Sequence, residues 1–305
     1  MSRIRVSGVK CFVGPREVDL TIPQGPGWTV FAGPNGSGKS TLLRALGAAL
    51  GALPGGPASR WGDGWVEASP APRWRVGDGR GEPRATFVEH AEGPHVPLHA
   101  DLVAEVLPSG WRVGDARRQR VTDGVLDLPL DELGDGTAAL ARLVSRLAQD
   151  PHPGPVLIDD VDRHLHPVWQ QRVGLWLTER FPHTQFLVAT HSPYVCQAAD
   201  PGALIRLPGP DESGRPHRLD EELRQRVLYG SGEDTVLSEL FGLPSAYSPT
   251  AEAERRLLVR LERKMYAGRA TDAELAEYRE LGAKLNSSLT ARVDEVTARL
   301  LGRGE

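Results

Sequence analysis

One segment has the residue types and spacing of a phosphate-binding loop. It fits the pattern G-x-x-x-x-G-K-[ST] at every fixed position, with the residues Gly33, Pro34, Asn35, Gly36, Ser37, Gly38, Lys39 and Ser40. The glycines let the backbone curl so that successive N–H groups point at phosphate oxygens. Lys39 would neutralise the β- and γ-phosphates, and the Ser40 hydroxyl would be a Mg²⁺ ligand. The alternative is a glycine-rich turn that matches by chance.

Two carboxylates, Asp159 and Asp160, follow the apolar run Val156–Ile158. The carboxyl end of a parallel strand lies at the sheet edge where the phosphate loop is also expected. Asp159 would hold Mg²⁺ there, directly or through water. Asp160 would position the attacking water. Neighbouring strand residues point to opposite sides, so the two acids are expected to differ in role. The alternative is a strand followed by solvated acids.

Histidines occur in two further segments. His191 follows the apolar strand Gln185–Ala189, where a neutral imidazole could donate a hydrogen bond to the γ-phosphate or the attacking water. The alternative is a capping or core histidine. His164 and His166 have a spacing found in metal sites and in partner contacts. No matching constellation of ligands is evident, so a dedicated transition-metal site is the less favoured interpretation.

The chain must supply elements that position these residues. Strands alternating with helices imply a parallel sheet with right-handed crossovers. The pattern predicts buried strands over Trp28–Ala32, Pro155–Ile158 and Gln185–Ala189, and helices over Lys39–Leu50, Asp135–Gln149 and Val168–Arg180. The Gly- and Pro-rich stretch from 51 and the residues up to 120 indicate a small irregular lobe with short strands such as Ala85–Glu89. Further helices are predicted over Glu221–Tyr229, Glu233–Phe241, Thr250–Tyr266, Asp272–Leu285 and Ser287–Leu301.

Composition limits the class of protein. The 305 residues are 40% hydrophobic and 25% charged, enough for a sizeable core. A net charge of −4 argues against a chain that coats nucleic acid by charge alone. Two cysteines, Cys11 and Cys196, make no disulfide framework and suit a reducing cytosol. The start of the chain lacks the apolar stretch of a signal peptide, and no apolar run approaches the ~20 residues that span a bilayer. We therefore expect a cytoplasmic protein without a membrane partner.

These segments, in this order, resemble the ABC-type ATPase heads of the RecF, SMC and overcoming-lysogeny-defect class. The resemblance rests on Gly33–Thr41, Leu157–Pro167 and Ala189–Pro193, and it covers about residues 1–210. Leu-His-Pro after the acids and Thr-His-Ser-Pro are typical of small bacterial AAA-annotated members. The resemblance implies an α/β fold, a P-loop NTPase of ABC-ATPase head type with ATP and Mg²⁺ as cofactors and Thr41 beside the phosphates. Its core would span 1–50 and 130–210, with a small β-rich lobe at 51–129 and a C-terminal helical extension at 211–305.

The resemblance also implies a homodimer that encloses ATP as a sandwich. The phosphate loop of one copy would face the signature motif of the other. The best candidate for that motif includes Gly134, Asp135 and Gly136, which open the helix up to Gln149. Backbone N–H groups and the helix dipole would meet the γ-phosphate. A helix-capping loop is the alternative.

The sequence departs from the family pattern in three places. Gly134 replaces the usual serine of the signature, and Asp160 replaces the usual glutamate and is one methylene shorter. The usual lid glutamine is not identifiable, because Gln119 is the only glutamine between the two motifs and lies late. A displacement of ~1 Å at a catalytic group can cost of order 100-fold in rate, so slow hydrolysis is expected.

The tail beyond Tyr229 resembles the helical extension of ATPases in phage-defence operons. Septu and retron-associated ATPases, which pair with an HNH nuclease, are the nearest kind. The implied function is an ATP-binding and ATP-hydrolysing subunit that regulates an effector, such as a nuclease or toxin encoded nearby, in antiviral defence or DNA maintenance. A nucleotide-gated scaffold with little turnover is the alternative. A transporter nucleotide-binding subunit is less favoured, because the signature serine and lid glutamine are missing.

Two weaker signals have a structural and a functional interpretation. The arginines of the lobe favour a solvated face over contact with DNA; they are Arg112, Arg117, Arg118 and Arg120. Phe12 has a place in the family pattern that suggests an adenine contact, but a core phenylalanine is the favoured interpretation. No segment indicates a self-contained nuclease.

Overall fold

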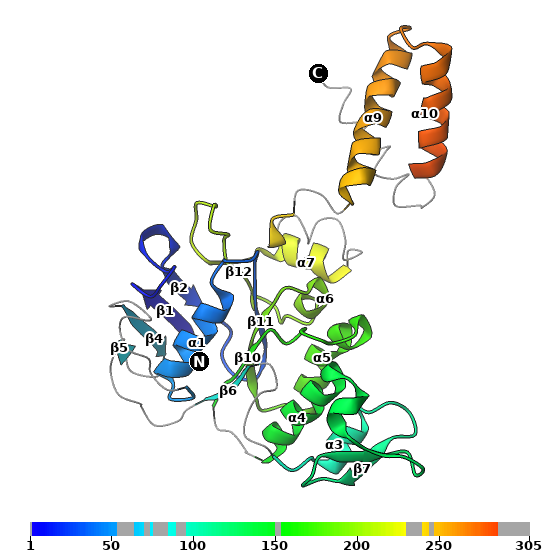
Figure 1. The fold of residues 1–305 in the computed structure, drawn as a ribbon. Coiled ribbons are helices and arrows are strands. Elements are labelled where there is room, and N and C mark those ends of the chain that lie inside the picture. Colours follow the sequence, from blue (N-terminus) through cyan, green and yellow to red (C-terminus); the bar gives the residue numbers. More distant parts are fainter. Residues whose placement is uncertain are drawn as a thin grey trace. The chain divides into compact units, whose positions relative to one another are not determined.

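The computed structural model describes residues 2–53, 64–69, 74–75, 85–89, 96–149, 154–229, 240–243 and 247–285. The chain divides into two compact units, Met1–Gly242 and Leu243–Glu305 (Figure 1). All of the candidate site residues belong to the first unit.

A sheet of six described strands forms the centre of the first unit (Figure 1). Its order is β13 (His217–Arg218), β12 (Leu204–Arg206), β3 (Gly27–Ala32), β11 (Gln185–Thr190), β10 (Val156–Asp159) and β6 (Thr86–Glu89). Neighbouring strands are parallel except β12 and β13. The predicted α/β class with a parallel sheet is confirmed.

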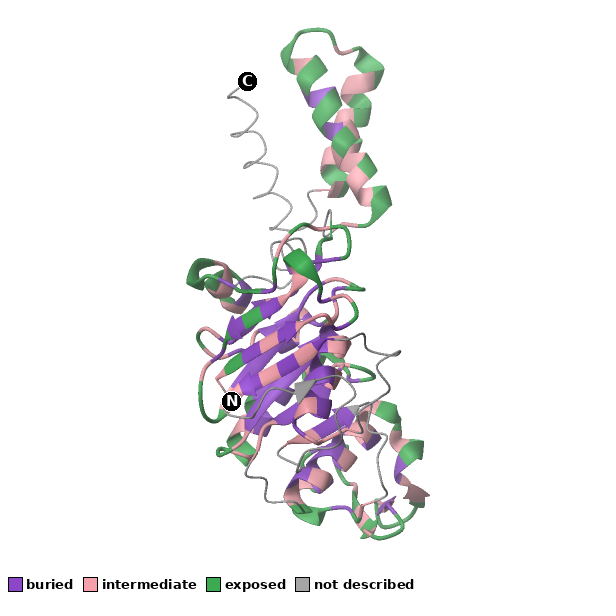
Figure 2. Cartoon of the chain, turned by 90° about the vertical axis from the view of Figure 1, so that its left-hand side faces the viewer, coloured by how far each residue is buried: buried purple, intermediate pink, exposed green. Residues whose placement is uncertain are grey.

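The central strands are buried on both faces, as the purple strands of Figure 2 show. In β3, Val30 packs into one apolar cluster and Phe31 into the other. Ile158 and Leu157 of β10 divide in the same way. Because strand side chains alternate between faces, each continuous apolar run supplies two cores at once.

Helices and a second sheet cover the two faces. Helix α1 (Lys39–Ala49) shares its core with the antiparallel sheet of β2 (Val18–Thr21), β1 (Arg3–Ser7), β4 (Trp65–Ser69) and β5 (Trp74–Arg75). The other face packs against α4 (Asp135–Gln149) and α5 (Pro167–Arg180). Helices α1 and α4 begin at the candidate site residues Lys39 and Asp135, and α5 begins after the loop that contains Asp160.

The inserted lobe is smaller than the predicted span of 51–129. Strand β4 pairs with β1, and β6 pairs in parallel with β10, so both belong to core sheets. Local sequence indicates that these segments are strands, but pairing with a distant strand is decided by tertiary packing. The elements of the lobe are helix α3 (Ala100–Ala104) and strands β7 (Arg112–Asp115), β8 (Arg120–Thr122) and β9 (Asp127–Pro129). A 3₁₀ helix, Leu130–Leu133, then leads into α4.

The predicted helical extension from residue 211 is divided between the two units. Helix α7 (Glu221–Tyr229) buries Val227 in the core of the first unit, next to the short helix α6 (Pro193–Cys196). Helices α9 (Pro249–Tyr266) and α10 (Asp272–Leu285) pack together as a hairpin in the second unit. The helix predicted over Ser287–Leu301 lies outside the described residues, as does most of the one over Glu233–Phe241.

None of the helices in the described part of the chain has the length and apolarity that crossing a bilayer requires.

Candidate active site

The phosphate loop connects the end of β3 to the start of α1, as predicted. A Cβ atom at Gly33 would lie 3.3 Å from the carbonyl carbon of Leu207 and closer still to its oxygen. A Cβ atom at Gly38, where φ is +99°, would lie 2.7 Å from Sγ of Cys11 and 2.8 Å from Cζ of Phe12. Both positions therefore require glycine, and the positive φ of Gly38 gives the backbone the curl that a phosphate-binding loop needs.

The close approach of Phe12 to Gly38 indicates the role of Phe12. Its side chain is fully buried in the core of the first unit and supports the turn at Gly38 from beneath. This placement favours the core interpretation of Phe12 over an adenine contact.

Lys39 is folded into the loop that precedes it. Its Nζ donates to the carbonyl oxygens of Gly33 at 2.8 Å and Pro34 at 3.1 Å, and only 4% of the residue is exposed. Burial lowers the pKa of Lys39 to about 8, and the negative charges of Asp160 and Asp159 act in the opposite direction. A phosphate bound in the loop would add a further negative charge beside the Lys39 ammonium group.

Asp159 lies at the carboxyl end of β10 and is 2% exposed. Oδ2 of Asp159 is 3.9 Å from Nε of Arg44, one helical turn beyond Ser40 on α1. The carboxylate of Asp159 and the hydroxyl of Ser40 are oxygen donors, which Mg²⁺ prefers. Among the described residues no group of three or more His, Cys, Asp or Glu side chains could hold a metal. Two oxygen donors fit a Mg²⁺ ion whose other ligands would be phosphate oxygens and water. They do not fit a metal ion that the protein coordinates on all sides.

Asp160 begins a turn rather than extending the strand. Strand β10 ends at Asp159, and Asp160 has φ of +51°, in the left-handed region. The alternation expected for two strand residues therefore does not set its direction. A left-handed non-glycine residue costs about 1–3 kcal/mol and persists only where its surroundings hold it. Asp160 lines a cavity of about 50 Å³ with Ala139 of α4 and with His164.

His191 follows β11 and remains exposed on one side. Partial burial, and then the charge of Lys39, lower the pKa of His191, whereas Asp160 and Asp162 act in the opposite direction. A lowered pKa favours the neutral imidazole, the form that can donate one hydrogen bond and accept another. The structure thus gathers Lys39, Asp160 and His191 from three loops into one electrostatic neighbourhood.

The candidate signature motif packs against the loop that follows β10. Helix α4 begins at Asp135, as predicted, and Gly134 before it has φ of +100°. A Cβ atom at Gly136 would lie 2.9 Å from the carbonyl carbon of His164 and closer still to its oxygen. Oδ2 of Asp135 is 3.8 Å from Nδ1 of His164. Asp135 itself has 76% of its side chain exposed, so the motif both contacts the loop and faces outward.

The two histidines of the His-x-His pattern have separate contacts. His164 has φ of +63° and lies beside Asp135. His166 caps α5, where its Nδ1 accepts from the backbone N of Val168 at 3.3 Å. These contacts support structural roles and give no support to a shared metal.

Gln119 is a structural residue of the lobe. It is 5% exposed, its Nε2 donates to the carbonyl of Val96 at 2.9 Å, and its Oε1 accepts from Nε of Arg142 at 2.9 Å. Both ends of the amide are occupied, so this glutamine does not serve as the lid that the family pattern would require.

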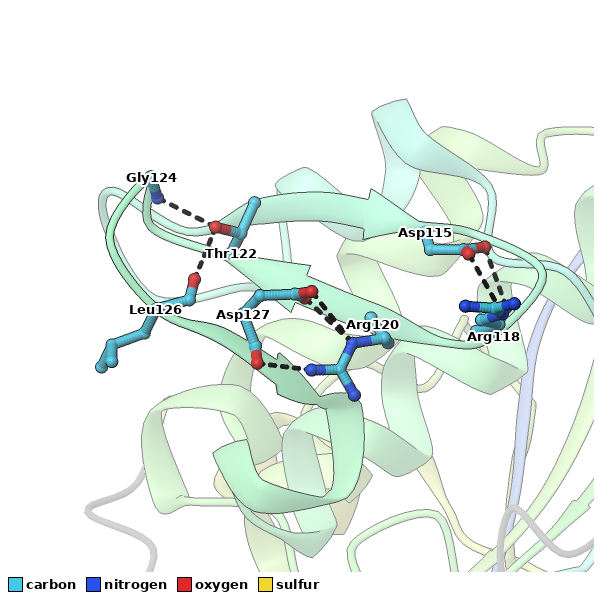
Figure 3. A network of polar contacts seen from close by, with 7 residues as sticks. All are labelled: Asp115, Arg118, Arg120, Thr122, Gly124, Leu126 and Asp127. Carbon is cyan, nitrogen blue, oxygen red and sulfur yellow. Dashed lines mark hydrogen bonds and ion pairs between the residues drawn. The ribbon is translucent and has the colours of Figure 1, made fainter.

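Two of the four arginines of the lobe, Arg118 and Arg120, face aspartates of the same lobe (Figure 3). Nε of Arg120 is 3.1 Å from Oδ2 of Asp127, and Nε of Arg118 is 3.7 Å from Oδ2 of Asp115. This alternation of charge favours the solvated-face interpretation over a DNA-binding stripe.

Arg16 is a residue of the site that sequence reasoning missed. Its Nη2 donates to the carbonyl oxygens of Ser37 at 3.1 Å and Pro208 at 3.0 Å. It thereby ties the phosphate loop to the segment after β12. The sequence offers no motif for this role, because the bond joins residues far apart in the chain.

Family models match two parts of the first unit. One, described as "AAA domain, putative AbiEii toxin, Type IV TA system", matches residues 116–197, and a second, described as "AAA domain", matches residues 3–79. Together these include the phosphate loop, the candidate signature, the two aspartates and His191.

Two curated relatives carry names from defence systems. The Retron Ec83 probable ATPase of Escherichia coli is 32% identical over 133 residues, which are 44% of this chain and 22% of the relative. The Septu protein PtuA of Bacillus thuringiensis is 34% identical over 98 residues, 32% of this chain and 24% of the relative. The match thus spans about a quarter or less of the length of these relatives.

Solved structures share the fold. An SMC head bound to the C-winged helix domain of ScpA has a TM-score of 0.52 at 15% identity, covering 74% of this chain and 99% of that chain. An Smc head domain with an extended coiled coil, bound to a ScpA domain from Pyrococcus furiosus, has a TM-score of 0.51 at 13% identity, covering 74% and 98%. The predicted fold of ABC-ATPase head type is confirmed.

Proposed function

We propose that this chain, an ATPase of the ABC and SMC head type related to the retron and Septu ATPases, hydrolyses ATP between two copies of itself and thereby regulates an effector protein. The names of the relatives support the setting in antiviral defence. The proposed effector is a nuclease of HNH type or a toxin encoded nearby, and the proposed location is the cytoplasm.

The observation that carries the proposal is the placement of Lys39, Asp159, Asp160 and His191 at or just after the carboxyl ends of β3, β10 and β11, which are neighbouring parallel strands of one sheet. In this proposal the backbone of Gly33–Thr41 binds the phosphates and Lys39 turns from its loop carbonyls to the β- and γ-oxygens. Ser40 and Asp159 hold Mg²⁺, which offsets phosphate charge. Asp160 orients the attacking water, and neutral His191 donates a hydrogen bond to the γ-phosphate.

The second copy completes the proposed site. The start of α4 presents the backbone N–H groups of Asp135 and Gly136 and the positive end of a helix dipole, whereas the N–H of Gly134 already donates to the carbonyl of Asp131. Such a helix start suits an anion that approaches from outside the chain. We propose that it meets the γ-phosphate bound to the other copy, so that dimerisation requires ATP.

The test measures ATP turnover and mass in solution, with and without Mg²⁺ and ATP, for the native chain and for Lys39→Ala. A dimer that forms only with ATP, with turnover that Lys39→Ala abolishes, supports the proposal. A monomer in every condition contradicts the sandwich. Capture from the native host then tests the effector, and recovery of no nuclease or toxin would remove that part.

A nucleotide-gated scaffold is the second candidate. Asp160 favours it, because its side chain is one methylene shorter than the glutamate of the family pattern and it lies in a left-handed turn after β10. Tight ATP binding without turnover, unchanged by Asp160→Ala, would identify this alternative.

A further inference from the structure

Gln170 bridges the loop after β10 and the residue after His191. From the first turn of α5, its Nε2 donates to the carbonyl oxygens of Leu165 at 2.9 Å and Asp162 at 3.4 Å. Its Oε1 accepts from Oγ of Ser192 at 2.7 Å. Carbonyl oxygens bond only to the amino side of the amide, so the orientation of Gln170 is determined by its partners.

A second set of hydrogen bonds closes a ring on the other side of His191. Oγ1 of Thr190 donates to Oδ1 of Asp162 and accepts from the backbone N of Ser192 at 2.9 Å. Thr190 is fully buried and Ser192 is 5% exposed, so these bonds are shielded from water. Of the two chain neighbours of His191, Thr190 is thus bonded to Asp162. Ser192 is connected through Gln170 to the loop that begins at Asp160.

The loop after β10 also contacts the candidate signature, because Gly136 lies close to the carbonyl of His164. We infer that Gln170 is a positioning residue, which holds His191 in place relative to Asp160 and couples it to the segment 134–136. This inference rests on the proposed function, in which His191 and that segment meet the γ-phosphate from the two copies.

The contacts require both halves of a carboxamide at this position. Glutamate would keep the acceptor for Ser192 but could not donate to Leu165 or Asp162. Methionine has a similar length and neither group. Gln171, the next residue of α5, is exposed and provides a matched control on the same helix.

The first measurement is steady-state ATP turnover of Gln170→Glu, Gln170→Met and Ser192→Ala, with Gln171→Glu as the control. We expect kcat to fall about 10- to 100-fold in the first three, because a small displacement of His191 is enough for that loss. KM should stay within about 2-fold, because the phosphate loop is untouched. The double variant Gln170→Met with Ser192→Ala should lose no more than the worse single variant. A kcat for Gln170→Met that equals that of Gln171→Glu would overturn the inference.

The second measurement does not depend on turnover. Hydrogen exchange of peptides is compared with and without ATP, using ATP with Ca²⁺ if hydrolysis is fast. In the native chain ATP should slow exchange over 160–166, 189–193 and 134–138 together. In Gln170→Met the other copy should still protect 134–138 directly, but ATP should slow exchange over 160–166 and 189–193 less than in the native chain. If the native chain binds ATP without hydrolysing it, the proposed function fails while this comparison still decides the role of Gln170. Equal protection of 160–166 and 189–193 in both chains would overturn that role.

Discussion

Gly136 lies against the carbonyl group of His164, at a distance that leaves no room for a side chain on residue 136. The start of α4 is thus held by the loop that also contains Asp160, 24 residues further along the chain than Gly136. This contact gives the glycine a packing role in addition to the anion-binding role expected of a signature motif.

Replacing Gly136 with alanine should therefore destabilise the first unit. The added Cβ atom forces α4 away from the loop, and overpacking of this kind costs about 1–3 kcal/mol in the free energy of unfolding. All of the tryptophans lie before residue 177, so tryptophan fluorescence during urea unfolding follows the first unit. Gly114→Ala, also in the first unit, is the control, because the atom nearest to a Cβ atom there would lie at an ordinary contact distance of 3.4 Å. Equal midpoints for Gly136→Ala and the native chain would contradict the packing.

The affinity for ATP should decrease as pH rises through about 8. Polyphosphate binds the protonated form of Lys39, and burial lowers the pKa of Lys39 to about 8 in the nucleotide-free protein. Above that pH the binding free energy includes the cost of protonating Lys39, so Kd should rise by up to about tenfold per pH unit. Calorimetric titration with ATP between pH 7.5 and 9.5 measures this slope. Lys39→Arg stays charged throughout and should give weaker binding without the slope. A constant Kd in the native chain would show that Lys39 remains fully charged.

Asp160→Asn should lower turnover about 100-fold while leaving the Kd for ATP within about 2-fold. The amide keeps the size of the side chain and tolerates the left-handed backbone, but it cannot accept a proton from the attacking water. Single-turnover hydrolysis and equilibrium binding separate the two quantities. Asp101→Asn, at an exposed position of α3, should change neither. Undiminished hydrolysis in Asp160→Asn would assign the positioning of the attacking water to another residue.

Gln119→Met should lower stability and leave ATP binding unchanged. The substitution removes the partners of the Val96 carbonyl and of Nε of Arg142, and leaving such groups unsatisfied costs about 1–3 kcal/mol. Gln149→Met is the control, since Gln149 also bonds a backbone carbonyl but is exposed. A clear loss of ATP affinity in Gln119→Met at unchanged stability would contradict this structural role and make Gln119 a candidate lid residue.

Local sequence patterns predicted most of the helices and strands of the core. Helix α4 runs from Asp135 to Gln149 as its apolar period predicts, and the buried runs become β3, β10 and β11. The partners of β4 and β6 were not predictable, because pairing depends on strands distant in the chain. For the same reason the sequence indicated an inserted lobe that includes both strands.

The candidate site was predictable where a motif is contiguous. The pattern from Gly33 to Ser40 identifies the loop, since its glycines and lysine act within a few residues of one another. Gln170 and Arg16 act through bonds to residues that lie far away in the chain or belong to another loop. The turn at Asp160 was missed because strand alternation was extended one residue beyond the end of β10.

The most direct test of the central claim mixes two inactive variants. Lys39→Ala removes the phosphate contact, and Asp135→Trp places bulk on the exposed side chain at the start of α4. If ATP is hydrolysed between copies, each mixed dimer has one intact site, and an equimolar mixture should recover about a quarter of the native turnover. Turnover of the mixture no higher than the mean of the two variants alone would contradict an ATP site shared between two copies.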